Sequence, residues 1–220
     1  MKIIKHRINL NNEIIYFFAP EGDDCAPGTL MGIQKNDWKL DKIDFKNNDV
    51  FVDIGCNIGL ISILVAKLFP FVRIFSFDAN PLAIECLKLA CQENKIKNIN
   101  PYNLAIGAEN RDVDFVTYSE NETCTVQKEI SNLRAITYKT KMICPELLFQ
   151  DILKSNVKYL KCDIEGGEFQ LFDYIFEKQR GILDKIEFLH LEIHPFDDSN
   201  PPTKKLKQKL QEKFGNKLFY

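Results

Sequence analysis

An acid and two glycines follow an apolar stretch early in the chain, in a pattern that suits a nucleotide-type cofactor. Residues 50–54 read Val-Phe-Val-Asp-Ile, and Gly55 and Gly59 come after them, separated by Asn57 and its neighbours. A continuous apolar run is typical of a buried parallel strand, and glycines beyond it let backbone amides approach a ligand at the start of the next helix. We therefore expect Asp53, Gly55, Asn57 and Gly59 to form one wall of a cofactor pocket.

The carboxylate of Asp53 distinguishes this pattern from the dinucleotide fingerprint. A pyrophosphate needs a helix N-terminus free of negative charge, so an acid at Asp53 would repel it. S-adenosylmethionine carries an ammonium and a sulfonium group and no phosphate, so the same acid favours this cofactor over NAD. A simpler interpretation, that Asp53 only caps the following helix, stays open at this point.

A second acid ends the next predicted strand. Residues 71–77 alternate apolar and polar side chains, and Asp78 follows Gly59 by 19 positions (78 − 59). A Rossmann-like unit places the carboxylate that binds ribose hydroxyls at an offset of ~20 residues. Taken alone, Asp78, Asn80 and Pro81 indicate only an ordinary turn between a strand and a helix. Because Asp78 stands at the expected distance from the first motif, the two motifs together predict an adenosine site.

Two later strands carry further acids. The predicted strand 157–162 is followed by Asp163, Glu165 and Glu168, and the predicted strand 186–193 is followed by His194, with Glu192 near its end. Ligands of open parallel sheets bind outside the carboxyl ends of the strands, so these groups should lie on the same edge as Asp53 and Asp78. Four acids and a histidine at that edge exceed what a scaffold needs.

The individual roles in this second set differ. Histidine is the side chain best matched to proton transfer near neutral pH, so we favour a functional His194 over a capped strand end. His190 lies further from the strand end and is expected to be a core group. Glu168 is explained by negative charge in the first turn of a helix, whereas Glu165, followed by two glycines, indicates a functional turn.

The elements that must position these residues alternate regularly from residue 50. The pattern predicts helices between the strands and, after strand 186–193, a helix at 203–214 and a short strand at 217–220. This order predicts an α/β fold with a doubly wound, mostly parallel sheet. Residues 1–49 are expected to form a β-rich cap or lid of the same domain, and residues 107–140 an antiparallel insertion within the main part, 50–220. The other predicted elements are strands 72–77 and 99–104 and helices 59–68, 81–94, 145–154 and 166–178.

Composition limits the function classes. The chain has 220 residues with 45% hydrophobic content and a formal charge of −2, which predicts one domain and gives no overall field favouring nucleic acid or an anionic membrane. Seven cysteines without a C-x-x-C pair favour reduced thiols. No apolar run has the length of a signal peptide or of a membrane span, so we expect a cytoplasmic protein.

With these motifs, the chain resembles the FkbM-type family of S-adenosylmethionine-dependent methyltransferases over about residues 50–195. The resemblance implies a class I, Rossmann-like methyltransferase whose acceptors are hydroxyl oxygens on sugars and natural products. It also implies that the backbone near Ala105 frames the adenine. The segments that carry it are residues 52–59, 77–81, 104–107, 161–168 and 191–194.

The chain departs from the family pattern in three places. Family members usually have Ala at the position of Cys56 and Glu at the position of Asp78, which are changes that keep size or charge. The chain also ends soon after the fifth predicted strand, where the fold normally adds two more strands. We therefore expect a shortened C-terminus, with the sheet edge and part of the acceptor pocket reduced or completed by a partner.

These inferences assign two sets of site residues. Asp163, Glu165, Glu192 and His194 form the reaction side, with His194 or Glu192 as the proton acceptor, and most of the rate acceleration comes from holding the reacting groups in line. The acceptor is expected to be a small molecule or glycan, with no nucleic acid partner and no membrane span. The expected cofactor-binding residues are Asp53, Gly55, Asn57, Gly59, Asp78 and Ala105.

Several alternatives remain open from the sequence. The four reaction-side groups suit manganese or iron, although we favour a site without metal. An NAD-linked oxidoreductase is disfavoured because this chain lacks the second of the closely spaced glycines in the dinucleotide fingerprint. A nucleic acid amino methyltransferase would need an N-P-P-aromatic motif after the fourth strand, whereas residues 200–203 come after the fifth and end in Thr203. A module that binds S-adenosylmethionine without catalysis is the alternative from another class.

Overall fold

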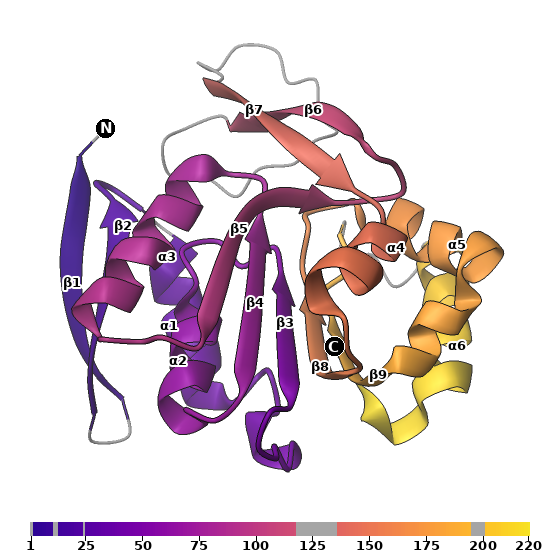
Figure 1. Ribbon diagram of the computed structural model, residues 1–220, viewed down its shortest axis with the longest axis horizontal. Helices are drawn as coiled ribbons and strands as arrows, with labels where there is room; N and C mark the ends of the chain where they lie inside the picture. Colours follow the sequence, from indigo (N-terminus) through magenta and orange to yellow (C-terminus); the bar gives the residue numbers. More distant parts are fainter. Residues whose placement is uncertain (1, 11–12, 24, 118–135, 195–200) are drawn as a thin grey trace.

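A mostly parallel sheet forms the centre of the molecule (Figure 1). The computed structural model describes residues 2–10, 13–23, 25–117, 136–194 and 201–220, and within these the central sheet has eight strands in the order β10-β9-β8-β3-β4-β5-β7-β6. All neighbouring pairs are parallel except β6 with β7. From β3 the strand order proceeds to one side of the sheet through β4 and β5, and later to the other side through β8 and β9. The boundary between β3 and β8 is therefore a topological switch point, which is where open α/β sheets bind ligands.

The observed strands end close to the acids and turns at which the sequence predicts strand ends. The predicted strands are confirmed to within two residues at each end, and the predicted antiparallel insertion is present as β6 and β7. Residues 118–135, which lie between these two strands, are outside the described residues. The strands are β3 (Val50–Ile54), β4 (Arg73–Asp78), β5 (Ile99–Ile106), β6 (Arg111–Thr117), β7 (Ile136–Ile143), β8 (Val157–Cys162), β9 (Ile186–Leu191) and β10 (Leu218–Phe219).

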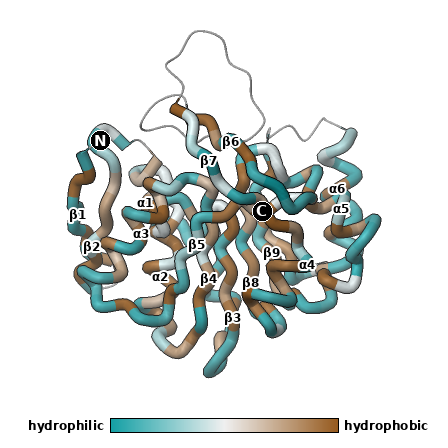
Figure 2. The backbone as a smooth tube through the Cα atoms, turned by 45° about the horizontal axis from the view of Figure 1, so that its top comes forward, coloured by the Kyte–Doolittle hydropathy of each residue, from teal (hydrophilic) through white to brown (hydrophobic). Residues whose placement is uncertain are grey.

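Alternate residues of β3 face two separate apolar layers. Val50, Val52 and Ile54 pack in a cluster with α5 and α6, whereas Phe51 packs in a cluster with α2 and α3. All five residues of β3 are buried, which explains its continuous apolar sequence. Figure 2 shows this apolar centre in the brown colouring of the inner strands. Asp53 therefore lies inside the layer that contains Phe51.

Helices cover both faces of the sheet (Figure 1). One face carries α1 (Cys25–Lys35), α2 (Leu60–Leu68) and α3 (Pro81–Glu93), and the other carries α4 (Pro145–Leu147), α5 (Glu168–Lys178) and α6 (Pro201–Phe214). Pro81 occupies the first turn of α3, and the side chain of Asn80 caps it by accepting from the Leu82 N–H at 3.0 Å. The helix expected at 145–154 continues after α4 as a π-helix over Leu148–Leu153.

The N-terminal segment contains more structure than the sequence predicts. Strands β1 (Ile3–Leu10) and β2 (Glu13–Pro20) form a separate antiparallel pair. The helix α1 then follows, although the sequence predicts only short β-like pieces in residues 1–49. The prediction of a purely β-rich cap misses this helix because Pro27 and Gly28 indicate a break, while the packing of α1 against α2 and of Gly32 against Trp38 stabilises the helix.

The C-terminal segment adds a strand to the sheet. β10 pairs in parallel with β9, in the place expected for a last short strand. Every cysteine within the described residues is a thiol, including the buried Cys56, Cys86, Cys144 and Cys162. No helix among the described residues combines the length and the apolar character needed to cross a bilayer.

Candidate active site

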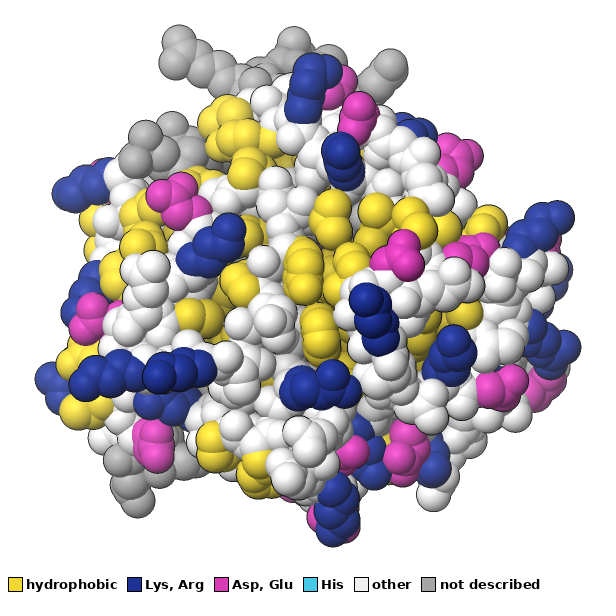
Figure 3. Space-filling view, in the orientation of Figure 1, with side chains coloured by type: hydrophobic (Ala, Val, Ile, Leu, Met, Phe, Trp, Pro, Cys, Tyr) yellow, Lys and Arg dark blue, Asp and Glu magenta, His cyan; other side chains and the backbone are white. Residues whose placement is uncertain are grey.

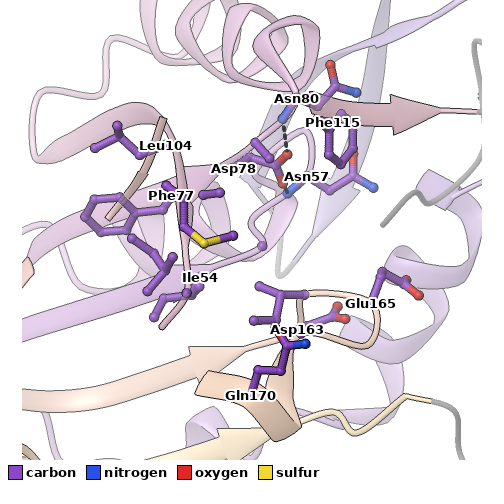
Figure 4. A pocket seen from close by; sticks show the side chains of 18 of the residues that line it. Ile54, Asn57, Phe77, Asp78, Asn80, Leu104, Phe115, Asp163, Glu165 and Gln170 are labelled. Carbon is purple, nitrogen blue, oxygen red and sulfur yellow. Dashed lines mark hydrogen bonds between the residues drawn. The ribbon is translucent and has the colours of Figure 1, made fainter. Parts of the chain in front are cut away.

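The carboxyl ends of β3, β4, β5 and β8 surround a hollow, which we call the first hollow. In Figure 4, Asp78, Asn57, Asn80 and Phe115 lie at one end of it, and Asp163 and Glu165 lie at the other. The hollow contains about 860 Å³ of space that no atom occupies, including space that is open to solvent. In Figure 3, apolar side chains are visible in the middle of the viewed face.

Asp78 is held in place by the turns that follow β3 and β4. Its Oδ2 atom accepts from the Asn57 N–H at 2.7 Å, and its Oδ1 atom accepts from the Asn80 N–H at 2.8 Å. Burial raises its pKa to about 6. A carboxylate offers about four lone-pair sites, so two remain for hydroxyl groups of a ligand. The structure therefore brings Asn57 and Asp78 together, as their spacing predicts.

Gly55 is required by close packing of two turns. It has a φ of 72°, and a Cβ atom there would lie 1.6 Å from the carbonyl oxygen of Asp163. Lys161 donates from Nζ to the Gly55 carbonyl oxygen at 2.7 Å. Asn57 also has a positive φ, of 49°. The turn after β3 is thus shaped to sit directly against the turn after β8.

Two residues expected in the pocket do not line the first hollow. Asp53 is fully buried, accepts from the Ser62 hydroxyl at 2.7 Å and lies 3.3 Å from Lys161 Nζ. Its charge is therefore balanced inside the protein and is not directed at a ligand. Gly59 instead permits helix packing, because a Cβ atom there would lie 2.4 Å from the Leu87 side chain of α3.

The remaining wall of the first hollow is apolar. Ala105 lies on it, as the family resemblance implies, between Leu104 and Ile106 of β5. Phe115 of β6 and Met142 of β7 complete it. Phe115 and Met142 carry no signal in the sequence for this position, since alternation in a strand indicates the face on which a residue lies and not the groups it contacts. An apolar wall beside a hydroxyl-binding carboxylate suits a nucleoside.

Glu168 organises the turn after β8, contrary to the expectation that it only favours the start of a helix. It is fully buried, and it accepts from the Ile164 N–H and the Gly166 N–H, each at 2.9 Å. Glu165 has a φ of 52°, an unfavourable backbone conformation for a residue with a side chain. The hydrogen bonds of Glu168 hold the strained turn in which Glu165 faces the first hollow.

His194 lies among three carboxylates. Its Nδ1 atom is 3.5 Å from Glu168 and 3.8 Å from Asp163, and its Nε2 atom is 3.8 Å from Glu165. The nearby Glu168 carboxylate, 3.5 Å from Nδ1, is the largest cause that raises the pKa of His194 to about 9. At neutral pH the imidazole already holds its proton, so it ties the end of β9 to the turn after β8 and is poorly suited to accept another proton.

Glu192 has a pKa suited to proton transfer. Burial is the largest cause that raises it to about 7, followed by the nearby charge of Asp163. Asp163 itself stays ionised, because Lys161 is 3.5 Å away and lowers its pKa against the opposing effect of burial. The structure thus brings all four expected reaction-side residues to one edge. Lys161, which the sequence analysis leaves unassigned, contacts both Asp53 and Asp163.

A metal ion does not fit the residues at this edge. Asp163, Glu168 and His194 offer ligand atoms within 4.8 Å of one another among the described residues. However, the Lys161 ammonium group lies 3.5 Å from Asp163 and would repel a cation there, and a metal would have to displace the proton that the raised pKa of His194 retains. We derive no step that depends on a metal.

Comparisons with known proteins agree on the fold. The sequence model of the methyltransferase small domain family matches residues 39–119. The structure of TYW2 from M. jannaschii in complex with AdoMet is 13% identical, with a TM-score of 0.50, and the match covers 97% of this chain and 74% of that one. No curated protein matches the sequence.

Other solved structures show the same kind of likeness. A precorrin-6y C5,15-methyltransferase from Geobacter metallireducens GS-15 is 14% identical, with a TM-score of 0.47 over 80% of this chain and 68% of that one. An rRNA methylase from Streptococcus thermophilus is 12% identical, with a TM-score of 0.45 over 80% of this chain and 76% of that one.

The fold and the strand-end site define the class. The chain has the Rossmann-like fold of class I methyltransferases, as the alternation of strands and helices predicts. The structure of the M. jannaschii protein, which shares this fold, is a complex of that protein with AdoMet.

Proposed function

We propose that this protein is an S-adenosylmethionine-dependent methyltransferase that methylates a hydroxyl oxygen of a sugar, a glycan or another small metabolite. One observation carries the proposal: the nucleoside-type hollow beside Asp78 reaches Asp163, and Glu192, with a pKa near 7, lies next to Asp163. The resemblance to the FkbM-type family supports oxygen as the acceptor atom.

In the proposed site the residues of the first hollow bind the cofactor. Asp78 accepts hydrogen bonds from the ribose hydroxyls, and the apolar wall with Ala105 packs against the adenine. Gly55 and Asn57 form the backbone floor, and Asp163 and Glu165 face the charged end of the cofactor. Asp53 acts indirectly, because its ion pair with Lys161 fixes the Gly55 turn.

Glu192 is the proton acceptor of the proposed reaction. S-adenosylmethionine, when bound, would supply an electrophilic methyl group, and its methyl–sulfur bond would break to leave neutral S-adenosylhomocysteine. The acceptor hydroxyl must lose its proton as its oxygen gains the methyl carbon, and Glu192 takes that proton. A carboxylate with a pKa of about 7 is half ionised near neutral pH, so it is available as a base and holds a proton well. His194 keeps the turn in place as an imidazolium.

The N-terminal part belongs to this proposal as well. We propose that residues 1–49 form a cap that is part of the same domain as residues 50–220. In support, Asn94 of α3 bonds to both backbone groups of Tyr16 in β2, at 3.0 and 2.5 Å. The expected partner is a small-molecule or glycan acceptor.

Calorimetry separates this proposal from its alternatives. We expect S-adenosylhomocysteine to bind and NAD not to bind, whereas the opposite result would indicate an oxidoreductase. Transfer of a labelled methyl group is then measured on glycans, lipids, peptides and an rRNA fragment. Turnover on the glycans supports the proposal. Turnover on the rRNA fragment alone contradicts the proposed acceptor, and cofactor binding without any turnover indicates a binding module.

A further inference from the structure

A second hollow adjoins the first, and it lies between α1 and the carboxyl ends of β8 and β9. Residues of α1, including Gly28 and Thr29, form one side, and Trp38 and Tyr220 also line it. Its open space is about 1520 Å³.

The two hollows meet at the proposed reaction centre. Gly55, Asn57 and Asp163 line both of them, while Glu192 and Lys161 line only the second. A molecule in the second hollow therefore lies beside the proton acceptor and reaches the charged end of the cofactor site across Asp163. This placement is what a methyl acceptor requires.

We propose that the second hollow is the acceptor site, that α1 forms its outer wall, and that it selects uncharged acceptors over anionic ones. The inference rests on the proposed methyltransferase function and adds to it the location of the acceptor and its charge. Residues 25–38 thereby become specificity-determining residues.

The charges around the hollow exclude anions. Asp37, Asp163 and Glu192 line it, and Lys161 is the cation among its described lining residues. The Nζ atom of Lys161 is already engaged, since it lies 3.3 Å from Asp53 and 3.5 Å from Asp163 and donates to the Gly55 carbonyl. With its side chain only 6% exposed, it has little capacity to bind a phosphate. An anionic acceptor would therefore meet the carboxylates of Asp37 and Glu192, while the lining cation Lys161 is already paired with Asp53 and Asp163.

The same charges disfavour an amine as the acceptor. Carboxylates stabilise the protonated form of a nearby amine and raise its pKa, and an ammonium group has no lone pair to react with a methyl group. A neutral hydroxyl group avoids this problem, because Glu192 removes its proton only as the new bond forms. Acidic and aromatic side chains together therefore favour a neutral polyhydroxylated molecule, whose flat face packs on Trp38.

The helix α1 is shaped to leave this space open. Gly32 lies against the indole of Trp38, and a Cβ atom there would be 2.7 Å from the ring. Gly28 differs, because a Cβ atom there would have no atom within 4 Å. A large side chain at position 28 would thus extend into the second hollow without a clash and without touching the first.

The chain offers a direct reporter, because Trp38 is its single tryptophan and lines the second hollow. The protein with bound S-adenosylhomocysteine is titrated with matched pairs of methyl glycosides and their 6-phosphates, and Trp38 fluorescence is followed. We expect at least one neutral glycoside to change the fluorescence and its phosphate to bind at least tenfold more weakly. A phosphate that binds as tightly as its neutral partner, or no response to any neutral glycoside, would overturn the selectivity.

The variant Gly28→Phe tests the location. We expect it to weaken glycoside binding and methyl transfer at least tenfold while the Kd for S-adenosylhomocysteine changes less than twofold. Met31→Phe is the matched control, since Met31 is 54% exposed on the same helix and does not line the hollow. Unchanged glycoside binding in Gly28→Phe would place the acceptor elsewhere. If the unmodified protein does not bind S-adenosylhomocysteine, the proposed function fails, which is a different result.

Discussion

The two hollows that meet at Asp163 are built from different kinds of structure. The first is formed by strand ends and tight turns, where backbone N–H groups fix Asp78 and Glu168 in place. The second is formed by a helix, Trp38 and the last residue of the chain, around a group of acids. The first is thus determined by backbone geometry, which suits an invariant cofactor. The second is determined by side chains, which can change with the acceptor.

The largest expected effect concerns the first hollow. Asp78→Ala removes the acceptor for the Asn57 and Asn80 N–H groups and the proposed ribose contact together. We expect the Kd for S-adenosylhomocysteine to rise about 100-fold by calorimetry, since hydrogen bonds to a charged group contribute about 1.5–3 kcal/mol each. Asp78→Glu is the control and should stay within about tenfold of the unmodified protein, because it keeps the charge. Equal binding by Asp78→Ala would show that the nucleoside lies elsewhere.

The next effect concerns the junction of the two hollows. Glu192→Gln should lower kcat by about 10²–10⁴-fold, the usual contribution of a general base, without changing S-adenosylhomocysteine binding. Glu187→Gln, on the exposed end of the same strand, is the control. The rate of the unmodified protein should rise with pH through about 7, where Glu192 loses its proton. A variant with unchanged turnover would remove Glu192 from the mechanism.

A smaller effect tests whether His194 stabilises the fold and is not a catalytic base. Its folded-state pKa of about 9 exceeds the ordinary value of 6.5, so its stabilising contribution is complete below pH 6.5 and is lost as pH rises through 9. His194→Gln should lower Tm by about 3 °C at pH 6, given that ~1 kcal/mol corresponds to about 2–4 °C at this size. At pH 10 the difference in Tm should nearly vanish. A difference in Tm that does not depend on pH would show that the imidazolium does not stabilise the turn.

The smallest expected effect concerns the apolar wall of the first hollow. Phe115→Leu shortens the apolar wall of the first hollow, and we expect the Kd for S-adenosylhomocysteine to rise about threefold to tenfold from the loss of apolar contact. Val116→Ala, on the other side of the same strand, is the control. Fluorescence titration of the second hollow should be unaffected by either variant. An equal change in both titrations would mean that the hollows do not bind separate ligands.

Patterns with a fixed period were readable from the sequence. The buried run of β3, the alternation in β4 and the proline at the start of α3 predicted those elements nearly to their ends. Because parallel strands end at one edge, the same patterns also predicted that Asp78, Asp163 and Glu192 would lie together. The helix α1 was missed, since Pro27, Gly28 and Gly32 lower its local helix propensity and its stability depends on packing with α2 and Trp38.

The sequence alone determined which residues stand at the ends of strands, because hydrophobic periodicity and turn residues are local properties. Tertiary structure decided what each of them faces. Asp53 is neutralised by Lys161 and Ser62, His194 is held as an imidazolium by three carboxylates, and Glu192 is left with a pKa near 7. The physical reason is that charge balance and burial depend on neighbours far apart in the chain, whereas strand ends depend on neighbours along it.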